Sequence, residues 1–260
     1  LLFDRSARQA RPTEAGVELL REGARLLSDV EAIAHRVRRV GTGWEPQLTL
    51  SIDGVISPTT VLELVEAFYA LSPPTRLKLR DGILSGTLES LIAGHADLAL
   101  GVAVSPGTVA GLQQESLGGM LFEFVVAPHH PLARGDQPLS DAEMREHRVI
   151  AVADSAQKGG VTMGILGGQD VLTVDTMQAK VQALLRGLGG GFLPEPMARA
   201  HVAAGRLVVR AVARPARTVQ LHYAWGGPGH SAPGRALQWW LEQLRKPATR
   251  RALLENHQPT

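Results

Sequence analysis

Two short stretches contain residue types that could do chemistry. GLGGG (residues 187–191) could cradle a phosphate, but it follows a helical pattern, and Phe192 stands where a nucleotide-binding loop needs its third glycine. We therefore interpret it as a helix stop and a tight turn. GHSAPG (residues 229–234) lacks the G-x-S-x-G spacing that exposes a serine nucleophile. Neither stretch predicts a nucleotide loop or a reactive serine.

The titratable residues do not suggest a catalytic group or a metal site. His129 and His130 are adjacent, so they cannot share a helix face, and the chain has no cysteine to add a thiolate ligand. Asp81, Asp97 and Asp175 each fall at the end of a strand or helix pattern, where capping explains them. The sequence therefore predicts a protein that is not an enzyme and that needs neither a metal nor a cofactor.

Polar helix starts are better candidates for a binding site. Hydroxyl-bearing residues follow the first two predicted strands, at residues 57–60 and 85–87. At the carboxyl ends of parallel strands, such starts present hydroxyls and free backbone N–H groups, which suit an anion such as a carboxylate. The same residues could instead only cap their own helices.

A third helix start, at residues 175–177, follows a strand of a second predicted lobe and would complete the site. We expect Asp175 to cap this helix and to point away, because a carboxylate repels an anionic ligand. The predicted ligand-binding residues are Ser57, Thr59, Ser85, Gly86, Asp175, Thr176 and Met177.

The elements that would position these residues alternate between strand and helix patterns. Strand, helix, strand, helix, strand over residues 48–102 indicates parallel α/β topology. A second α/β block follows, and the chain returns to the first with a strand at 219–225 and a helix at 232–244. Because the chain passes from the first block to the second and back again, we predict a two-lobed body with a cleft for a small ligand. After Pro247 the sequence predicts a polar, frayed tail.

A long amphipathic helix precedes this body. Thr13 is a good N-cap, Glu14 adds negative charge to the first turn, and Gly41 and Gly43 end the pattern. About 28 helical residues would span about 42 Å at 1.5 Å per residue. One narrow apolar stripe favours pairing with a second copy; the alternative is a helix lying on its own chain. The stripe consists of Val17, Leu20, Ala24, Leu27, Val30, Ile33, Val37 and Val40.

The composition is that of an ordinary globular protein, with 44% hydrophobic and 20% charged residues among 260. The formal net charge of +2 does not by itself argue for nucleic acid. No apolar run approaches the roughly 18 residues of a membrane span, and no apolar h-region follows the basic start. We expect a cytoplasmic protein, and the start at Leu1 suggests a piece of a longer product. The distribution of charge says more, because arginines flank one segment near the N-terminus: Arg5, Arg8 and Arg11 on one side and Arg36, Arg38 and Arg39 on the other.

Three motifs occur in order along the chain: LFDRSARQARPTEAG (residues 2–16), LIAGHADLALG (residues 91–101) and GLGGGFLPEPMA (residues 187–198). They resemble, in turn, the wing and helix start, the L-x-x-G-x-x-D-hydrophobic motif and the G-x-G-x-x-x-L-P turn of LysR-type transcriptional regulators. Pro12 departs from the usual apolar residue before the threonine. The resemblance implies a winged helix-turn-helix, a dimerising linker helix and a two-lobed effector domain like that of periplasmic binding proteins.

In that family pattern the recognition helix would lie before Leu1, and Arg5 and Arg8 of the wing would sit beside the phosphate backbone of DNA. The resemblance also implies an effector bound between the lobes. The predicted organisation is a wing remnant at 1–12, a linker helix at 13–43, subdomain I at 47–118 and 216–246, subdomain II at 119–215, and a tail at 247–260.

We thus expect the dimerisation and effector-sensing portion of a DNA-binding regulator. Its expected partners are DNA, through the intact parent protein, and an organic acid or amino acid as effector. A second copy of the chain would complete a homodimer, with a homotetramer as the larger option. A free-standing solute-binding protein of the same two-lobed fold is the alternative, and an enzyme on this fold is a further one.

Overall fold

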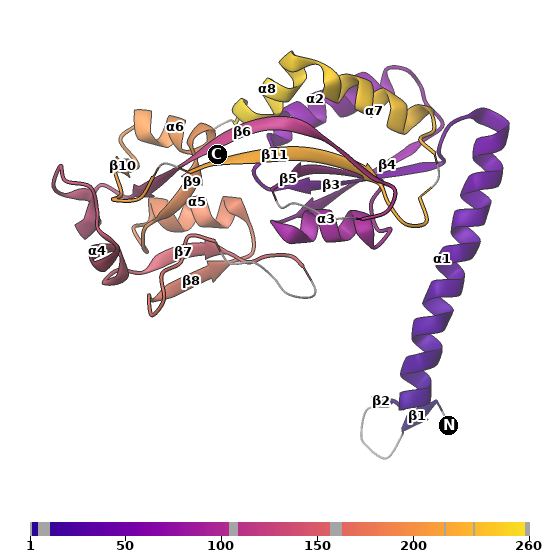
Figure 1. The fold of residues 1–260 in the computed structure, drawn as a ribbon, viewed down its shortest axis with the longest axis horizontal. Helices are drawn as coiled ribbons and strands as arrows, with labels where there is room; N and C mark the ends of the chain where they lie inside the picture. Colours follow the sequence, from indigo (N-terminus) through magenta and orange to yellow (C-terminus); the bar gives the residue numbers. More distant parts are fainter. Residues whose placement is uncertain are drawn as a thin grey trace.

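The computed structural model describes residues 2–4, 11–103, 109–156, 163–215, 217–230 and 232–257. Figure 1 shows a two-lobed body and a long helix that projects away from one lobe, with a small hairpin at its far end. The wing arginines Arg5 and Arg8 lie outside the described residues. The helix and hairpin are α1 (Glu14–Thr42), β1 (Phe3–Asp4) and β2 (Arg11–Pro12).

The projecting helix begins where the sequence predicts. Thr13 caps α1, since its Oγ1 accepts a hydrogen bond from the N–H of Gly16 at 3.2 Å. Leu20 and Leu27 of the apolar stripe are 59% and 68% exposed, so the body of this chain does not cover them. Val17, Val30 and Ile33 of the stripe are exposed as well, and Figure 1 shows the helix projecting away from the lobes.

One seven-stranded sheet runs through both lobes, in the order β10-β6-β11-β5-β3-β4, with β9 also paired to β6. β3 is parallel to β4 and β5, whereas β6 and β11 run side by side antiparallel and connect the two lobes (Figure 1). The strands are β3 (Gln47–Asp53), β4 (Arg76–Gly82), β5 (Leu98–Val102), β6 (Leu112–Val126), β9 (Gly191–Pro194), β10 (Val208–Arg210) and β11 (Arg217–Gly226).

In the first lobe, α2, α7 and α8 cover one face of the sheet and α3 covers the other (Figure 1). Phe68 of α2 and Trp240 of α7 are fully buried between the helices and the sheet, where their rings lie 6.4 Å apart. The helices are α2 (Pro58–Tyr69), α3 (Ser85–Ile92), α7 (Arg235–Arg245) and α8 (Pro247–Glu255).

The last helix differs from the expected polar tail. Residues 247–255 form α8, and the side chains of Leu253 and Leu254 are buried in the core. The backbone N–H of Ser57 donates to the carbonyl of Leu253 at 2.8 Å, which ties α8 to the start of α2. Two adjacent leucines in a mostly polar segment suffice to dock it, because burying each apolar side chain contributes about 1.5–3 kcal/mol.

The second lobe contains a small parallel sheet of β7 and β8, packed with α5 against the outer parts of β6 and β9 (Figure 1). Gly187 follows α5 with φ +70°, and a Cβ there would lie 2.2 Å from His129 Nε2. The predicted helix stop at GLGGG is therefore confirmed. The elements are η1 (Pro131–Ala133), α4 (Asp141–Arg145), β7 (Val149–Val152), β8 (Val171–Val174), α5 (Met177–Leu185) and α6 (Glu195–Ala203).

The mixed α/β class and the two-lobed architecture are thus as predicted. Among the described residues, no helix combines the length and the apolar composition required to cross a membrane.

Candidate effector-binding site

A cavity of about 210 Å³ lies between the two lobes. It is small beside the roughly 300–1,000 Å³ of drug-sized pockets. Asp53 and Leu84 line it from the first lobe, and Val152, Met177 and Phe192 line it from the second. Most of its other walls are apolar side chains, so the cavity suits a small molecule with an apolar body.

Asp53, at the end of β3, is the carboxylate that lines this cavity. Its side chain is only 5% exposed, and its two oxygens accept from the backbone N–H of Val55 (3.1 Å) and of Leu84 (2.8 Å). A third hydrogen bond, from Thr87 Oγ1, is 3.3 Å long. Burial raises the pKa of Asp53 to about 6, and the negative charge of Asp154 also raises it. These three hydrogen bonds hold the loop before α3 and occupy the carboxylate oxygens of Asp53.

The start of α3 binds a carboxylate, and that carboxylate belongs to the protein. Asp154 follows β7 of the second lobe and accepts hydrogen bonds from the backbone N–H of Ser85 (3.3 Å) and of Gly86 (3.0 Å). The hydroxyl of Ser85 also donates to Asp154. An anion at a helix start matches the free N–H groups and the helix dipole. Asp154 therefore already fills the anion position that the sequence predicts at this helix.

The neighbouring residues extend this bridge between the lobes. Ile83 N–H donates to Ser155 Oγ at 2.9 Å, and Ser155 N–H donates to the carbonyl of Ile83 at 3.3 Å. A Cβ at Gly86 would lie 2.1 Å from Ser155 Oγ, so this close approach requires glycine. We call the set Ile83, Ser85, Gly86, Asp154 and Ser155 the inter-lobe contact.

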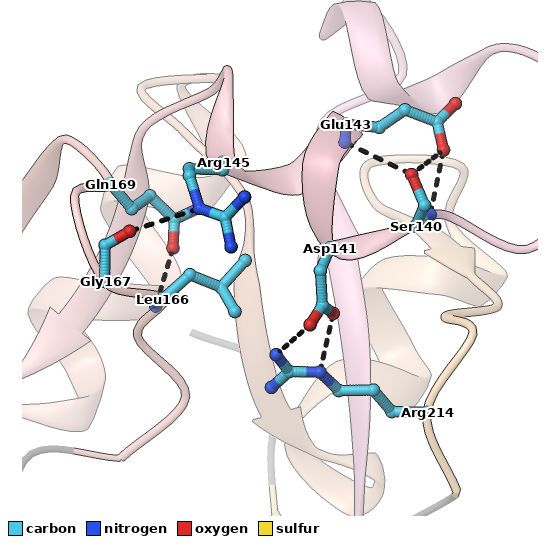
Figure 2. A network of polar contacts seen from close by, with 8 residues as sticks. All are labelled: Ser140, Asp141, Glu143, Arg145, Leu166, Gly167, Gln169 and Arg214. Carbon is cyan, nitrogen blue, oxygen red and sulfur yellow. Dashed lines mark hydrogen bonds and ion pairs between the residues drawn. The ribbon is translucent and has the colours of Figure 1, made fainter.

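Among the residues that the structure describes, three cationic side chains line the cavity, and they differ in how their charge is balanced. The guanidinium of Arg214 pairs with Asp141, with Nε 2.6 Å from Oδ1, within the polar network around α4 (Figure 2). Arg217 is exposed to solvent at the edge of the cavity. Lys180 of α5 is only 7% exposed. Lys180 is thus the buried cation of the site.

No carboxylate within the described ranges forms an ion pair with Lys180. Burial lowers the pKa of its ammonium group to about 8, and no neighbouring anion offsets this. Gly191 of β9 leaves room for the lysine, because a Cβ there would lie 3.2 Å from Lys180 Cε. Nor do the residues that the structure describes include a group of three potential metal-ligating side chains.

The sequence profile of the LysR substrate binding domain matches residues 41–248. The chain belongs to the LysR family of transcriptional regulators. Among its curated relatives, the HTH-type transcriptional regulator YeeY of Escherichia coli K12 is 32% identical over 94% of this chain and 78% of its own. The probable HTH-type transcriptional regulator YhaJ of the same strain is 31% identical over 95% of this chain and 81% of its own.

A solved structure supports the same assignment. Full-length LysG from Corynebacterium glutamicum, a LysR-type regulator, superposes with a TM-score of 0.60 at 25% identity, over 100% of this chain and 84% of its own. LysR-type regulators bind DNA, respond to small-molecule effectors and form oligomers. This chain is therefore a LysR-type regulator with an effector-binding domain.

Of the predicted ligand-binding residues of this LysR-type domain, Met177 lines the cavity. Thr176 caps α5 by accepting from the N–H of Ala179 at 3.0 Å, so it, and not Asp175 as expected, makes this cap. Asp175 is exposed and Thr59 is half-buried. Thr59, Asp175 and Thr176 are not among the residues that line the cavity.

Ser57 is fully buried at the start of α2. Its Oγ accepts from the N–H of Thr60 at 3.1 Å and donates to the carbonyl of Asn256 at 2.7 Å, so it caps α2 and holds the residue after α8. Ser85 and Gly86 are not among the residues that line the cavity, and their N–H groups bind Asp154. A ligand role for Ser57, Thr59, Ser85, Gly86, Asp175 and Thr176 stays a prediction.

Sequence reasoning missed Asp53, Asp154 and Lys180. A signal for Lys180 exists in the helix pattern, because Met177, Lys180, Val181 and Leu184 fall on one face at spacings of three and four and all are buried. A lysine on the buried face of an amphipathic helix calls for an explanation. No comparable signal exists for Asp154, whose partner lies 69 residues away in the sequence.

Proposed function

We propose that this chain is the dimerisation and effector-sensing portion of its regulator, and that the effector is an organic acid or an amino acid bound in the inter-lobe cavity. The observation that supports this proposal is the cavity itself, which both lobes line; among its described lining residues, Lys180 and Arg217 are cations without a carboxylate partner, and Asp53 is the one carboxylate. A ligand with an anionic group would balance this excess of positive charge.

The mechanism follows from which residues connect the lobes. An effector in the cavity touches both lobes and favours the lobe arrangement that it binds best. Ser85 and Gly86 can reach it only in an arrangement where Asp154 releases their donors. If the hydrogen bonds of the inter-lobe contact are replaced by hydrogen bonds to the effector, the angle between the lobes would change. Through α1, this change would alter the geometry of the oligomer.

The effector proposal predicts ligand-dependent stability. A thermal-shift screen of small organic acids and amino acids should find compounds that raise the melting temperature, because binding stabilises by RT ln(1 + [L]/Kd). Uncharged analogues of the same size should give smaller shifts. A screen in which no small molecule of any charge stabilises the chain would contradict effector binding in this cavity.

The dimerisation proposal depends on the exposed apolar stripe of α1. Leu20→Asp combined with Leu27→Asp should weaken the dimer strongly, because pairing would bury two unpaired charges. Sedimentation velocity measures the oligomer directly. Leu188→Asp in the second lobe, also an exposed leucine, serves as the matched control and should leave the oligomer unchanged. An oligomer that survives the double substitution would place the interface elsewhere.

DNA is the second proposed partner, bound by the intact parent protein in the cytoplasm. The relatives are HTH-type transcriptional regulators, which supports this proposal. We further propose that the protein binds its effector without converting it.

A further inference from the structure

Lys180 is a buried ammonium group that has no counter-ion among the described residues. Its side chain is 7% exposed and lines the cavity, and no carboxylate of the described chain pairs with it. A buried charge costs several kcal/mol unless an opposite charge compensates it. Most of the other residues that line the cavity are apolar, and Asp53, its described carboxylate, forms no ion pair with Lys180, so a ligand in the cavity is the available source of compensation.

We propose that Lys180 is the anchor for a carboxylate of the effector, and that the effector is a small organic acid with an apolar body. The inference rests on the proposed effector-sensing function and names its ligand class. The carboxylate would lie against α5 in the second lobe, and the apolar body would pack between Phe122, Phe192 and Val219.

The competing anion position is already occupied. The donors at the start of α3 bind Asp154, and a ligand carboxylate placed there would lie beside both Asp154 and Asp53, which repel it. Arg214 is compensated by Asp141, and Arg217 is exposed to solvent. Lys180 is the cation whose desolvation a ligand carboxylate would relieve most.

An amino acid is the less suitable ligand for this geometry. Its ammonium group would need an acceptor in the cavity, and Asp53 is the lining residue with a carboxylate. The oxygens of Asp53 already accept three hydrogen bonds from Val55, Leu84 and Thr87. A second buried cation would therefore stay poorly compensated, whereas an uncharged apolar body suits the remaining walls.

Matched acid and amide probes test this inference. We would measure, by calorimetry at pH 7, the binding of 4-methylpentanoate, 3-phenylpropionate and their primary amides to the full chain. The wild-type protein should bind each acid at least about tenfold more tightly than its amide, as a charge-assisted hydrogen bond predicts. Lys180→Met should remove this preference by weakening acid binding and leaving amide binding unchanged.

Lys78→Met, a substitution of an exposed lysine on β4, is the control and should keep the acid preference. A second measurement uses only the wild-type protein, so it does not depend on the variant folding. Affinity for the acids should fall between pH 7 and pH 9.5 as free Lys180 loses its proton, whereas affinity for the amides should not. Asp53, whose pKa is about 6, is largely ionised at pH 7, and the ion pair with Asp141 raises the pKa of Arg214 further above this range.

The outcomes separate this inference from the broader function. Acid binding that is independent of pH, or an acid preference that survives in Lys180→Met, overturns the role of Lys180. Binding of the amides with no preference for the acids overturns the ligand class but keeps the effector cavity. A wild-type protein that binds neither acids nor amides overturns this inference, and a wider screen without any ligand overturns the proposed function as well.

Discussion

Leu84 before α3 and Lys180 of α5 line the same cavity, and both helices favour an anion there, but within the described chain only the start of α3 binds a carboxylate of the protein. At α3, Asp154 accepts from Ser85 and Gly86 and links the lobes. At α5, Lys180 is buried without such a partner. We infer from this difference that the two anions have different roles. The carboxylate of Asp154 holds the lobes together, and the carboxylate of a ligand would compensate the charge of Lys180.

The largest expected effect concerns Lys180. Burial lowers its pKa from 10.5 to about 8, so the unfolded chain binds more protons between these pH values and stability should rise with pH there. Lys180→Met removes the buried charge and should raise the free energy of unfolding at pH 7 by on the order of 3 kcal/mol. Urea denaturation at pH 7 and pH 9.5 measures both effects.

The same substitution should also flatten the rise in stability between the two pH values. Lys78→Met, on the exposed edge strand, should change neither quantity. A loss of stability in Lys180→Met at pH 7 would mean that the ammonium group is compensated, and the contrast between α3 and α5 would disappear.

The next effect concerns Asp154. Asp154→Ala leaves the N–H groups of Ser85 and Gly86 without their acceptor, and we expect a loss of about 2 kcal/mol. Amide hydrogen exchange at both residues should accelerate as the lobes separate. Asp136→Ala, at an exposed aspartate of the same lobe, is the control. Exchange rates that match the wild type would show that the inter-lobe contact does not hold the cleft.

The smallest effect concerns the two neighbouring carboxylates. Asp154→Asn removes one negative charge but keeps a carbonyl oxygen as acceptor, so the pKa of Asp53 should decrease slightly from about 6. Because a raised pKa makes the folded state lose stability as the pH rises from 3.8 to 6, this loss should become smaller in the variant. Carboxyl NMR titration of Asp53 tests it, with Asp136→Asn as the control. A pKa of Asp53 that is unchanged or higher in Asp154→Asn would contradict the electrostatic coupling between Asp53 and Asp154.

Local patterns predicted much of the fold. The cap at Thr13 and the glycine stop after α5 were predicted correctly, the strand pattern ends at residue 102 as β5 does, and Ser57 caps α2, which was the alternative to its predicted ligand role. These features depend on neighbours within a few residues, which the sequence shows directly. The helix α8 was not predicted. Its two buried leucines, Leu253 and Leu254, are adjacent, so they show no helical periodicity that would distinguish a docked helix from a polar tail.

The candidate site was less predictable, for a physical reason. The sequence indicated that the helix starts carry donors suited to an anion, and Met177 does line the cavity. It could not indicate that Asp154 uses the donors of Ser85, because the two residues lie 69 positions apart and meet only when β7 and α3 come together. Nor could it indicate that Lys180 has no counter-ion in the part of the chain that the structure describes, since that depends on every element that packs around α5.

The sequence by itself thus determined the family motifs, the alternation of strands and helices, the two lobes and the amphipathic α1, because each of these depends on local periodicity and short spacings. The tertiary structure alone decided which charges are compensated. Asp154 is placed against α3 and Lys180 is left in an apolar wall by the packing of one lobe against the other, and electrostatic energies in such a site depend on burial and on distances between atoms remote in the chain.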